Sequence, residues 1–402
     1  MSIVENPLET LTRQQLRKRT SEKWQHYPQD VLPLWVAEMD VEPAPTVVEA
    51  LTHALRTGDT GYPSGDPYPQ AFQQFAAHQW GWDGFSADRM RTVPDVMTGI
   101  SAAINVLTEP GDAVIVCSPV YPPFYLFTRE LGRTVLEAPL TDNGRLDPAA
   151  ISAAFEQARA TTRQPVLLLA NPHNPTGVAH TRYELTAVVE IARQFNGRII
   201  ADEIHAPLML DGTPFTPLLS VDGAQNAFSV FSASKAWNLA GLKAAVLCAG
   251  PHAQADLARV SSTVDRGVSH LGVLAHTAAL TDGQDWLTAL LKGLTGNRNL
   301  VMELVREHLP GVEIQAPEAT YLAWLDCTDL DLPEQGPDTP AAQHGLTGPA
   351  AFFFNHANVA LNDGAPFGSG GQGHVRLNFG TSPAIVREAI EHMGAAVREF
   401  AD

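Results

Sequence analysis

The chain has 402 residues, 45% of them hydrophobic, and a formal net charge of −18 at pH 7. This is the composition of an ordinary globular protein, long enough for one large domain and one smaller one. The net negative charge argues against partners such as nucleic acid or anionic membranes, because both attract clustered Lys and Arg. No apolar run in the sequence reaches the roughly 18 residues of a membrane span.

Two features indicate a reducing compartment, and we expect the protein in the cytoplasm. The basic stretch from Arg13 to Arg19 runs into polar sequence without an apolar core, so a secretory signal is not expected. The three cysteines, Cys117, Cys248 and Cys327, are odd in number and lie far apart in apolar surroundings. This pattern predicts buried thiols rather than disulfides or a zinc site.

The middle of the chain alternates short β-rich runs with helical patterns. It predicts an α/β fold with a mostly parallel sheet covered by helices. Thr181 and Glu184 form the capping box of one intervening helix, and Gly197 supplies its end. The strand-like runs are apolar throughout, as expected of strands buried on both faces, and span 114–117, 166–170, 199–201, 228–231 and 244–248.

From about residue 286 the pattern changes, which predicts a large domain over 46–285 and a small C-terminal domain over 286–402. Residues 1–45 are expected to join the small domain. A helix over 286–308, a strand over 321–325 and a strand over 374–379 flank a loop rich in Pro, Gly and Asp at 328–349. The run GSGGQG at 368–373 fits a dinucleotide-binding pattern, but it precedes a strand rather than a helix, so we interpret it as a loop.

Polar, Gly or Pro clusters follow four of the predicted strands. In open α/β sheets, ligands bind beyond the carboxyl ends of the strands, so these clusters predict one shared site. Their sequences are SPVYPPF (118–124), NPHNPTG (171–177), DEIH (202–205) and SASK (232–235).

Lys235 and Asp202 are the main candidates for chemistry at this site. Lys235 is one of five lysines and lies in an apolar segment, where desolvation favours an amine able to form a Schiff base. The alternative is a lysine whose stem packs while its head reaches water. Asp202 ends a buried strand and could pair with a protonated pyridine nitrogen. A helix cap, a structural ion pair or a metal site with Glu203 and His205 are its alternatives.

Other residues could hold a phosphate, a ring and a carboxylate. Met97 and Thr98 begin a predicted helix whose N–H groups suit a phosphate, with Ser232 and Lys243 beside it. Thr98 could equally be a simple N-cap. The remaining two candidates are Tyr121, which could stack on an aromatic cofactor or simply pack, and Arg376, which could grip a substrate carboxylate or form a structural salt bridge.

Taken together, these motifs resemble the fold-type I pyridoxal-phosphate (PLP) enzymes, the aspartate aminotransferase superfamily. NPxNPTG, then an Asp about thirty residues on, then SxSK is a specific combination. Within that superfamily the chain resembles the cystathionine β-lyase, or C–S lyase, group typified by MalY and PatB. The resemblance runs from about residue 19 to 382 and includes LPLWVAEMD (32–40), GYP (61–63), ADEIHAPL (201–208), SASKAWNLAGLK (232–243), VALNDGAPFG (359–368) and HVRLNFGTS (374–382).

The resemblance implies a role for each candidate. Lys235 would attach PLP and Asp202 would hold its pyridine nitrogen, while Arg376 would bind the α-carboxylate of an amino-acid substrate. Tyr62 would reach the phosphate of a partner subunit, which implies a homodimer with shared active sites. The other cofactor contacts would come from Tyr121 stacked on the ring, Asn174 near the phenolic oxygen and the substrate carboxylate, His205, and the phosphate-binding set Met97, Thr98, Ser232 and Lys243.

The implied reaction is β-elimination from L-cystathionine or another cysteine S-conjugate, which gives a thiol, pyruvate and ammonia. An aminotransferase is the nearest alternative, since it uses the same residues. Typical aminotransferases have Tyr where this chain has His205, and DEIH is usual in the lyase group. Lys243 occupies a position that is often Arg, which would make its phosphate contact a point charge. A binding protein that keeps the fold for regulation is an alternative from another class.

Overall fold

The computed structural model describes residues 5–401, and the chain divides into two compact units. The unit that we call the large unit comprises Pro43–Asn174 and Val178–Leu287. The small unit comprises the chain up to Glu42, the short stretch Pro175–Gly177 and the chain from Thr288 on. The boundaries predicted at 45 and 285 lie close to these divisions. No feature of the sequence predicts that residues 175–177 belong to the small unit.

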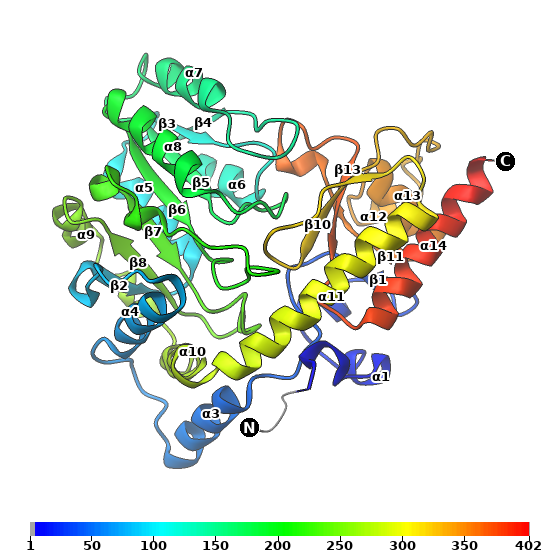
Figure 1. Ribbon diagram of the computed structural model, residues 1–402, viewed down its shortest axis with the longest axis horizontal. Coiled ribbons are helices and arrows are strands. Elements are labelled where there is room, and N and C mark those ends of the chain that lie inside the picture. The colour runs from blue at the N-terminus through cyan, green and yellow to red at the C-terminus, as the bar shows by residue number, and fades with distance from the viewer. Residues whose placement is uncertain (1–4, 402) are drawn as a thin grey trace. The chain divides into compact units, whose positions relative to one another are not determined.

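A seven-stranded sheet forms the centre of the large unit (Figure 1). Its strand order is β2-β8-β7-β6-β5-β3-β4, and only β8 runs antiparallel to its neighbours. The strands are β2 (Met90–Val93), β3 (Ala113–Val116), β4 (Thr134–Glu137), β5 (Val166–Ala170), β6 (Arg198–Asp202), β7 (Phe228–Phe231) and β8 (Ala245–Ala249). The predicted α/β fold with a mostly parallel sheet is confirmed.

Helices cover both faces of this sheet, and successive residues of a strand serve opposite faces. Val114 and Val116 of β3 pack into a core with α5 and α9, whereas Ala113 and Ile115 pack into a core with α7 and α8. This period of two explains why the strands are apolar at every position. The helices of the large unit are α3 (Pro45–Thr57), α4 (Pro67–Trp80), α5 (Val96–Leu107), α6 (Pro123–Glu130), α7 (Pro148–Ala158), α8 (Arg182–Gln194), α9 (Gln254–Arg259) and α10 (His270–Asp282).

Helix α8 begins as its sequence predicts. The Thr181 hydroxyl accepts from the backbone N–H of Glu184, and the Glu184 carboxylate accepts from the N–H of Thr181. Both bonds satisfy N–H groups that the first turn of a helix leaves free. The helix ends at Gln194, two residues before Asn196 adopts a left-handed φ of 53°, and the N–H of Gly197 closes the turn on the carbonyl of Ala192.

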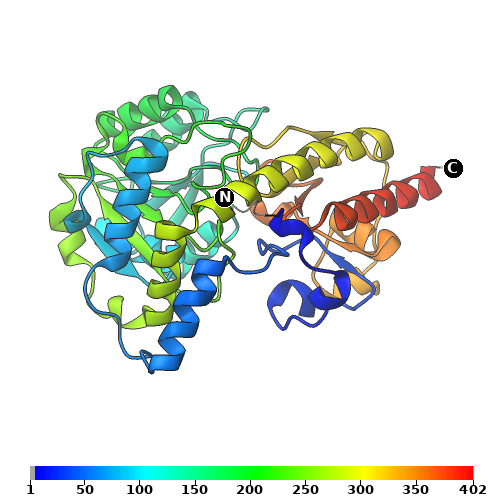
Figure 2. The same cartoon turned by 60° about the horizontal axis from the view of Figure 1, so that its bottom comes forward.

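The small unit contains a four-stranded antiparallel sheet of order β12-β13-β10-β9 and a parallel pair, β1 with β11. Helices α11 and α14 run side by side in it, shown in yellow and red (Figure 2), and Gly394 of α14 lies against His308 of α11. The strands are β1 (Leu32–Pro33), β9 (Glu313–Ile314), β10 (Leu322–Asp326), β11 (Val359–Ala360), β12 (Asn362–Asp363) and β13 (His374–Asn378). The helices are α1 (Arg13–Leu16), α2 (Glu22–Gln25), α11 (Gln284–His308, which starts in the large unit), α12 (Pro340–Gln343), α13 (Gly348–Ala357) and α14 (Pro383–Ala401).

One predicted loop is wrong in part. The segment 328–349 contains α12, which begins because the Thr339 hydroxyl accepts from the N–H of Ala342 and Pro340 supplies a preset first helical residue. Its Pro and Gly content masked this single helical turn. The run 368–373 is a loop before β13, as predicted.

All three cysteines are free and buried, as predicted. Burial raises the pKa of the Cys117 and Cys327 thiols to about 12, so both remain protonated. Among the helices of residues 5–401, none combines the length and the apolar character needed to cross a membrane.

Candidate active site

Backbone hydrogen bonds in the large unit join the loops that follow β3, β5 and β6, and join the last of these to strand β7. The N–H of Tyr121 donates to the carbonyl of Asn174 at 3.1 Å, and the N–H of Asn171 donates to the carbonyl of Asp202 at 2.9 Å. The N–H of Glu203 donates to the carbonyl of Val230 at 2.9 Å. The four polar clusters predicted from the sequence therefore meet at one edge of the sheet.

Asp202 has the carboxyl pKa that is shifted furthest from its ordinary value at this edge of the sheet. It is buried, and burial raises the pKa of its carboxyl to about 7, although the N–H of Ile204, 3.1 Å from Oδ1, and the charge of Lys235 oppose the shift. Asp202 pairs with Val230 of the neighbouring strand β7, and Lys235 follows the end of that strand by four residues, so the two principal candidates lie at the ends of adjacent strands. A buried carboxylate beside one cation is suited to hold a protonated ring nitrogen.

Both carboxylate oxygens of Glu203, the next residue, accept hydrogen bonds from other groups of the protein. Its Oε1 accepts from the N–H of Leu218 at 2.7 Å and from Asn171, and its Oε2 accepts from the hydroxyl of Ser229. Because its oxygens are occupied in this way, we interpret Glu203 as a structural residue. Across residues 5–401, no group of three or more His, Cys, Asp or Glu is arranged to hold a metal ion.

The predicted phosphate-binding residues gather at the start of α5, with one residue that the sequence analysis missed. Asp95, not Thr98, is the N-cap: its Oδ1 accepts from the N–H of Thr98 at 2.8 Å, so the interpretation of Thr98 as N-cap is wrong. Lys243 pairs with the other oxygen of Asp95 at 3.1 Å. Burial opposes ionisation of Asp95, but these two donors outweigh it and lower its pKa. The Asp before the apolar periodicity was the available signal.

Close packing sets the position of this helix start. A Cβ at Gly99 would lie 2.9 Å from a methyl of Val230, so glycine allows α5 to approach β7. Met97 and Thr98 are half-buried at the same turn. Ser232, at the end of β7, donates its hydroxyl to the carbonyl of Ala244 and accepts from the N–H of Ser234, so it shapes the turn that carries Lys235.

Four further candidates have differing environments. Asn174 and His205 are buried, and Tyr121 is half-buried on the same edge of the sheet. Tyr62 stands apart from them, since its side chain is 90% exposed on the loop between α3 and α4.

Arg376 belongs to the small unit, where it is held rigidly in β13. Its Nη2 donates to the carbonyl of Trp35 at 3.2 Å and to the side chain of Asn362, and its guanidinium lies over the ring of Phe367. It is buried in the small unit. The described geometry therefore suits a guanidinium oriented in advance for an anion.

The segment from Trp35 to Val41, here called the tethered segment, has no regular structure of its own, yet side chains fix its backbone. Asn378 donates to the carbonyls of Val36 and Glu38 at 2.6 and 2.7 Å. Every carbonyl from Trp35 to Met39 accepts from a side chain, the donors being Arg376, Asn378, Tyr321, Lys23 and Arg19.

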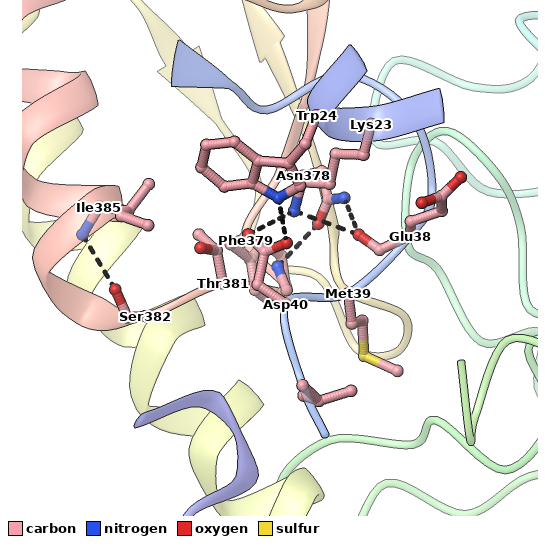
Figure 3. Close-up of polar contacts among 12 residues, drawn as sticks. Lys23, Trp24, Glu38, Met39, Asp40, Asn378, Phe379, Thr381, Ser382 and Ile385 are labelled. Atoms are coloured by element: carbon pink, nitrogen blue, oxygen red, sulfur yellow. Dashed lines mark hydrogen bonds and ion pairs between the residues drawn. The ribbon is translucent and has the colours of Figure 1, made fainter. Parts of the chain in front are cut away.

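A buried ion pair anchors the far end of the tethered segment (Figure 3). Lys23 Nζ lies 2.8 Å from Asp40 Oδ2, and each side chain is only 1% exposed. The indole N–H of Trp24 donates to the other oxygen of Asp40 at 2.7 Å, so that both carboxylate oxygens have a donor. Lys23 was not a predicted site residue, because its partner lies 17 residues away and outside any recognised motif.

Comparisons with known proteins show the family of the chain. The family model for aminotransferase class I and II matches residues 29–393. The chain belongs to that family. A protein of Mycobacterium leprae, assigned provisionally as a cystathionine β-lyase, is 54% identical over 98% of this chain and 99% of its own length. The cystathionine β-lyase of Corynebacterium glutamicum is 33% identical over 96% and 98% of the two chains.

A solved structure extends the agreement to three dimensions. The crystal structure of a Corynebacterium diphtheriae protein, described provisionally as a PLP-dependent β-cystathionase, has a TM-score of 0.88 and 34% identity. It covers 96% of this chain and 98% of its own. The predicted membership of the fold-type I enzymes and the resemblance to the cystathionine β-lyase group are confirmed, whereas the roles of individual site residues remain predictions.

The Lys23–Asp40 pair yields a stability prediction. Lys23→Met should lower the free energy of unfolding by about 3–5 kcal/mol, because it removes the nearer cation of a buried carboxylate and leaves only Arg19, 3.9 Å away. Arg193→Met, which removes the exposed partner of Glu190, is the control and should leave the free energy of unfolding nearly unchanged. Denaturant unfolding followed by circular dichroism measures both. Equal effects of the two substitutions would show that the buried pair is not an anchor.

Asp202 yields a pH prediction for the cofactor-free protein. Its pKa is raised in the folded state, so its contribution favours folding below pH ~4 and is lost as the pH rises through about 7. The melting temperature of the wild type should therefore fall more between pH 5 and pH 8 than that of Asp202→Asn, which cannot ionise. Glu203 has a pKa raised to about 7 by burial and contributes to both curves. Parallel curves would contradict the prediction.

Proposed function

We propose that this protein is a PLP-dependent C–S β-lyase that cleaves L-cystathionine or a related cysteine S-conjugate. The observation that carries the proposal is the buried Asp202 at the end of β6, under the influence of the Lys235 charge. Relatives at 33% and 32% identity, from Corynebacterium glutamicum and Bacillus subtilis, bear the name cystathionine β-lyase and support the substrate class.

The residues present fit the cofactor. Lys235 would attach it, Asp202 would pair with its ring nitrogen and Tyr121 would stack on the ring. Asn174 and His205 would line its other edge. The first turn of α5 and the Lys243 ammonium would face the phosphate, which is the chemistry that a helix N-terminus supplies to anions, and the phosphate would compete with Asp95 for Lys243 and for the N–H of Thr98. The remaining phosphate contacts would come from Met97, Thr98, Ser232 and, from the partner subunit, Tyr62.

Three side chains of the protein would have separate roles in the reaction. Bound PLP supplies an electron sink for the charge left when Cα loses its proton. The amine of Lys235 takes that proton, and the carboxylate of Asp202 keeps the ring nitrogen protonated. Arg376 binds the α-carboxylate and thereby orients Cα. With a thiolate on Cβ as leaving group, the products from cystathionine and water are homocysteine, pyruvate and ammonia.

The activity test is a product assay with L-cystathionine alone. Pyruvate, ammonia and homocysteine should appear in equal amounts without any 2-oxo acid acceptor, because elimination needs no second substrate. Lys235→Ala should abolish turnover, and borohydride should no longer fix the cofactor to the protein. Strict dependence on a 2-oxo acid, with formation of its amino acid, would assign the protein as an aminotransferase instead.

We also infer a homodimer in the cytoplasm. The three free cysteines suit a reducing compartment. For the dimer, α3 and the Asn238–Leu242 stretch line an apolar groove of about 370 Å³ in the large unit. Val48 and Leu55 of this groove are 47% and 60% exposed. Exposed apolar side chains around a groove favour burial against a protein surface, and the exposed ring of Tyr62 is available for the same contact.

The dimer can be tested by charge insertion. Leu55→Glu should shift sedimentation toward the monomer and lower the specific activity, because a carboxylate would be buried at the interface. Leu126→Glu is the matched control, since Leu126 is 53% exposed on α6 and outside the groove. A wild-type protein that sediments as a fully active monomer would remove this inference and the role of Tyr62.

A further inference from the structure

The turn that carries Lys235 has little regular structure to hold it. It connects β7 to β8 over residues 232–244. Within it, the N–H of Trp237 donates to the carbonyl of Ala233, and the N–H of Leu239 donates to the carbonyl of Ser234. These bonds shape the turn internally. They do not fix it to the rest of the large unit.

The indole N–H of Trp237 donates to the carbonyl of Gly283 at 3.3 Å, and two buried side chains from separate helices supply a further attachment on the N-terminal side of Lys235. The Tyr68 hydroxyl, from α4, accepts from the N–H of Ala233 at 3.1 Å, two residues before Lys235. The same hydroxyl lies 3.2 Å from Nδ1 of His276, from α10. Tyr68, Ala233 and His276 are all completely buried, and their two helices pack together in the lower part of the large unit (Figure 1).

Burial acts on both side chains of this contact. It raises the pKa of Tyr68, so the hydroxyl stays protonated while its oxygen accepts from Ala233. It lowers the pKa of His276 to about 4, so the imidazole is neutral, and its tautomer decides which of the two groups donates the proton between them.

Helix α10, which carries His276, lies against the second half of the same turn. The N–H of Ser269 donates to the carbonyl of Lys243 at 3.1 Å, and a Cβ at Gly272 would lie 2.8 Å from that oxygen. The chain of contacts therefore runs from Ala233 through Tyr68 and His276 to α10 and the residues beyond Lys235. It spans the turn on both sides of the lysine.

We propose that Tyr68 and His276 are positioning residues that fix the backbone on both sides of Lys235. The inference rests on the proposed attachment of the cofactor to Lys235. Loss of the hydroxyl would leave the buried N–H of Ala233 without a partner and free the start of the turn. The amine of Lys235 would then lose its fixed direction, and a displacement of about 1 Å at a reacting group can lower turnover about a hundredfold.

The first test compares Tyr68→Phe with Tyr125→Phe in the holoenzyme. Tyr125 is a matched control, because it is also buried and its hydroxyl donates to Glu137 at 2.7 Å, on α6 and β4. Tyr68→Phe should lower kcat about tenfold or more with KM changed less than about twofold. It should also move the pH midpoint of the visible absorption of bound PLP by about half a unit or more. The control should change neither.

The second test uses His276 and does not depend on turnover. His276→Asn keeps a polar group near the position of Nδ1, whereas His276→Leu removes it. In the cofactor-free protein, amide hydrogen exchange over residues 232–244 should accelerate about tenfold in His276→Leu and in Tyr68→Phe, and less in His276→Asn.

The outcomes separate the inference from the proposed function. Exchange and absorption that are unchanged in Tyr68→Phe, or changed equally in Tyr125→Phe, would overturn the positioning role. A different result would overturn the proposed function instead. In that case exchange accelerates in the variants, but the wild-type protein is inactive on every thioether, or its cofactor is fixed at another lysine. The structural attachment of the turn would then remain valid.

Discussion

Burial of Asp202 at the end of β6 is the constraint around which the large unit is organised. A carboxylate removed from water costs free energy unless a cation or several donors compensate. Here one backbone N–H and the charge of Lys235 offset that cost only in part, and the pKa remains raised. The surrounding strands are buried on both faces, so polar groups can gather only where the strands end. The candidate site therefore lies at that edge of the sheet.

The elements predicted from the sequence are those whose signals are local. The strands over 166–170 and 228–231 match the structure, since continuous apolar runs bounded by polar clusters identify buried strands. The capping box of α8 is equally local, and it is present. Turn-rich composition misled the analysis over 328–349, because a single helical turn such as α12 leaves no periodicity to detect.

The site was predictable to a smaller extent, for a related reason. Lys235 and Asp202 stand in motifs, and the structure brings them together. The N-cap role of Asp95 was predictable, since its partner Thr98 lies three residues on, but its ion pair with Lys243 joins residues 148 positions apart. Partners that distant leave no trace in local spacing. The same holds for Tyr68 and His276, which are separated by 208 positions.

The tethered segment has a consequence for engineering. Its donors hold main-chain oxygens, which every residue type possesses, and the anchoring ion pair lies at Asp40. Val36 and Glu38 are the partly exposed positions between Trp35 and Met39. Their side chains are therefore not needed to hold the backbone of the segment in place. A library that randomises these two side chains would vary shape and charge on an unchanged backbone. The tethered segment is thus a suitable place to diversify the protein without redesigning its scaffold.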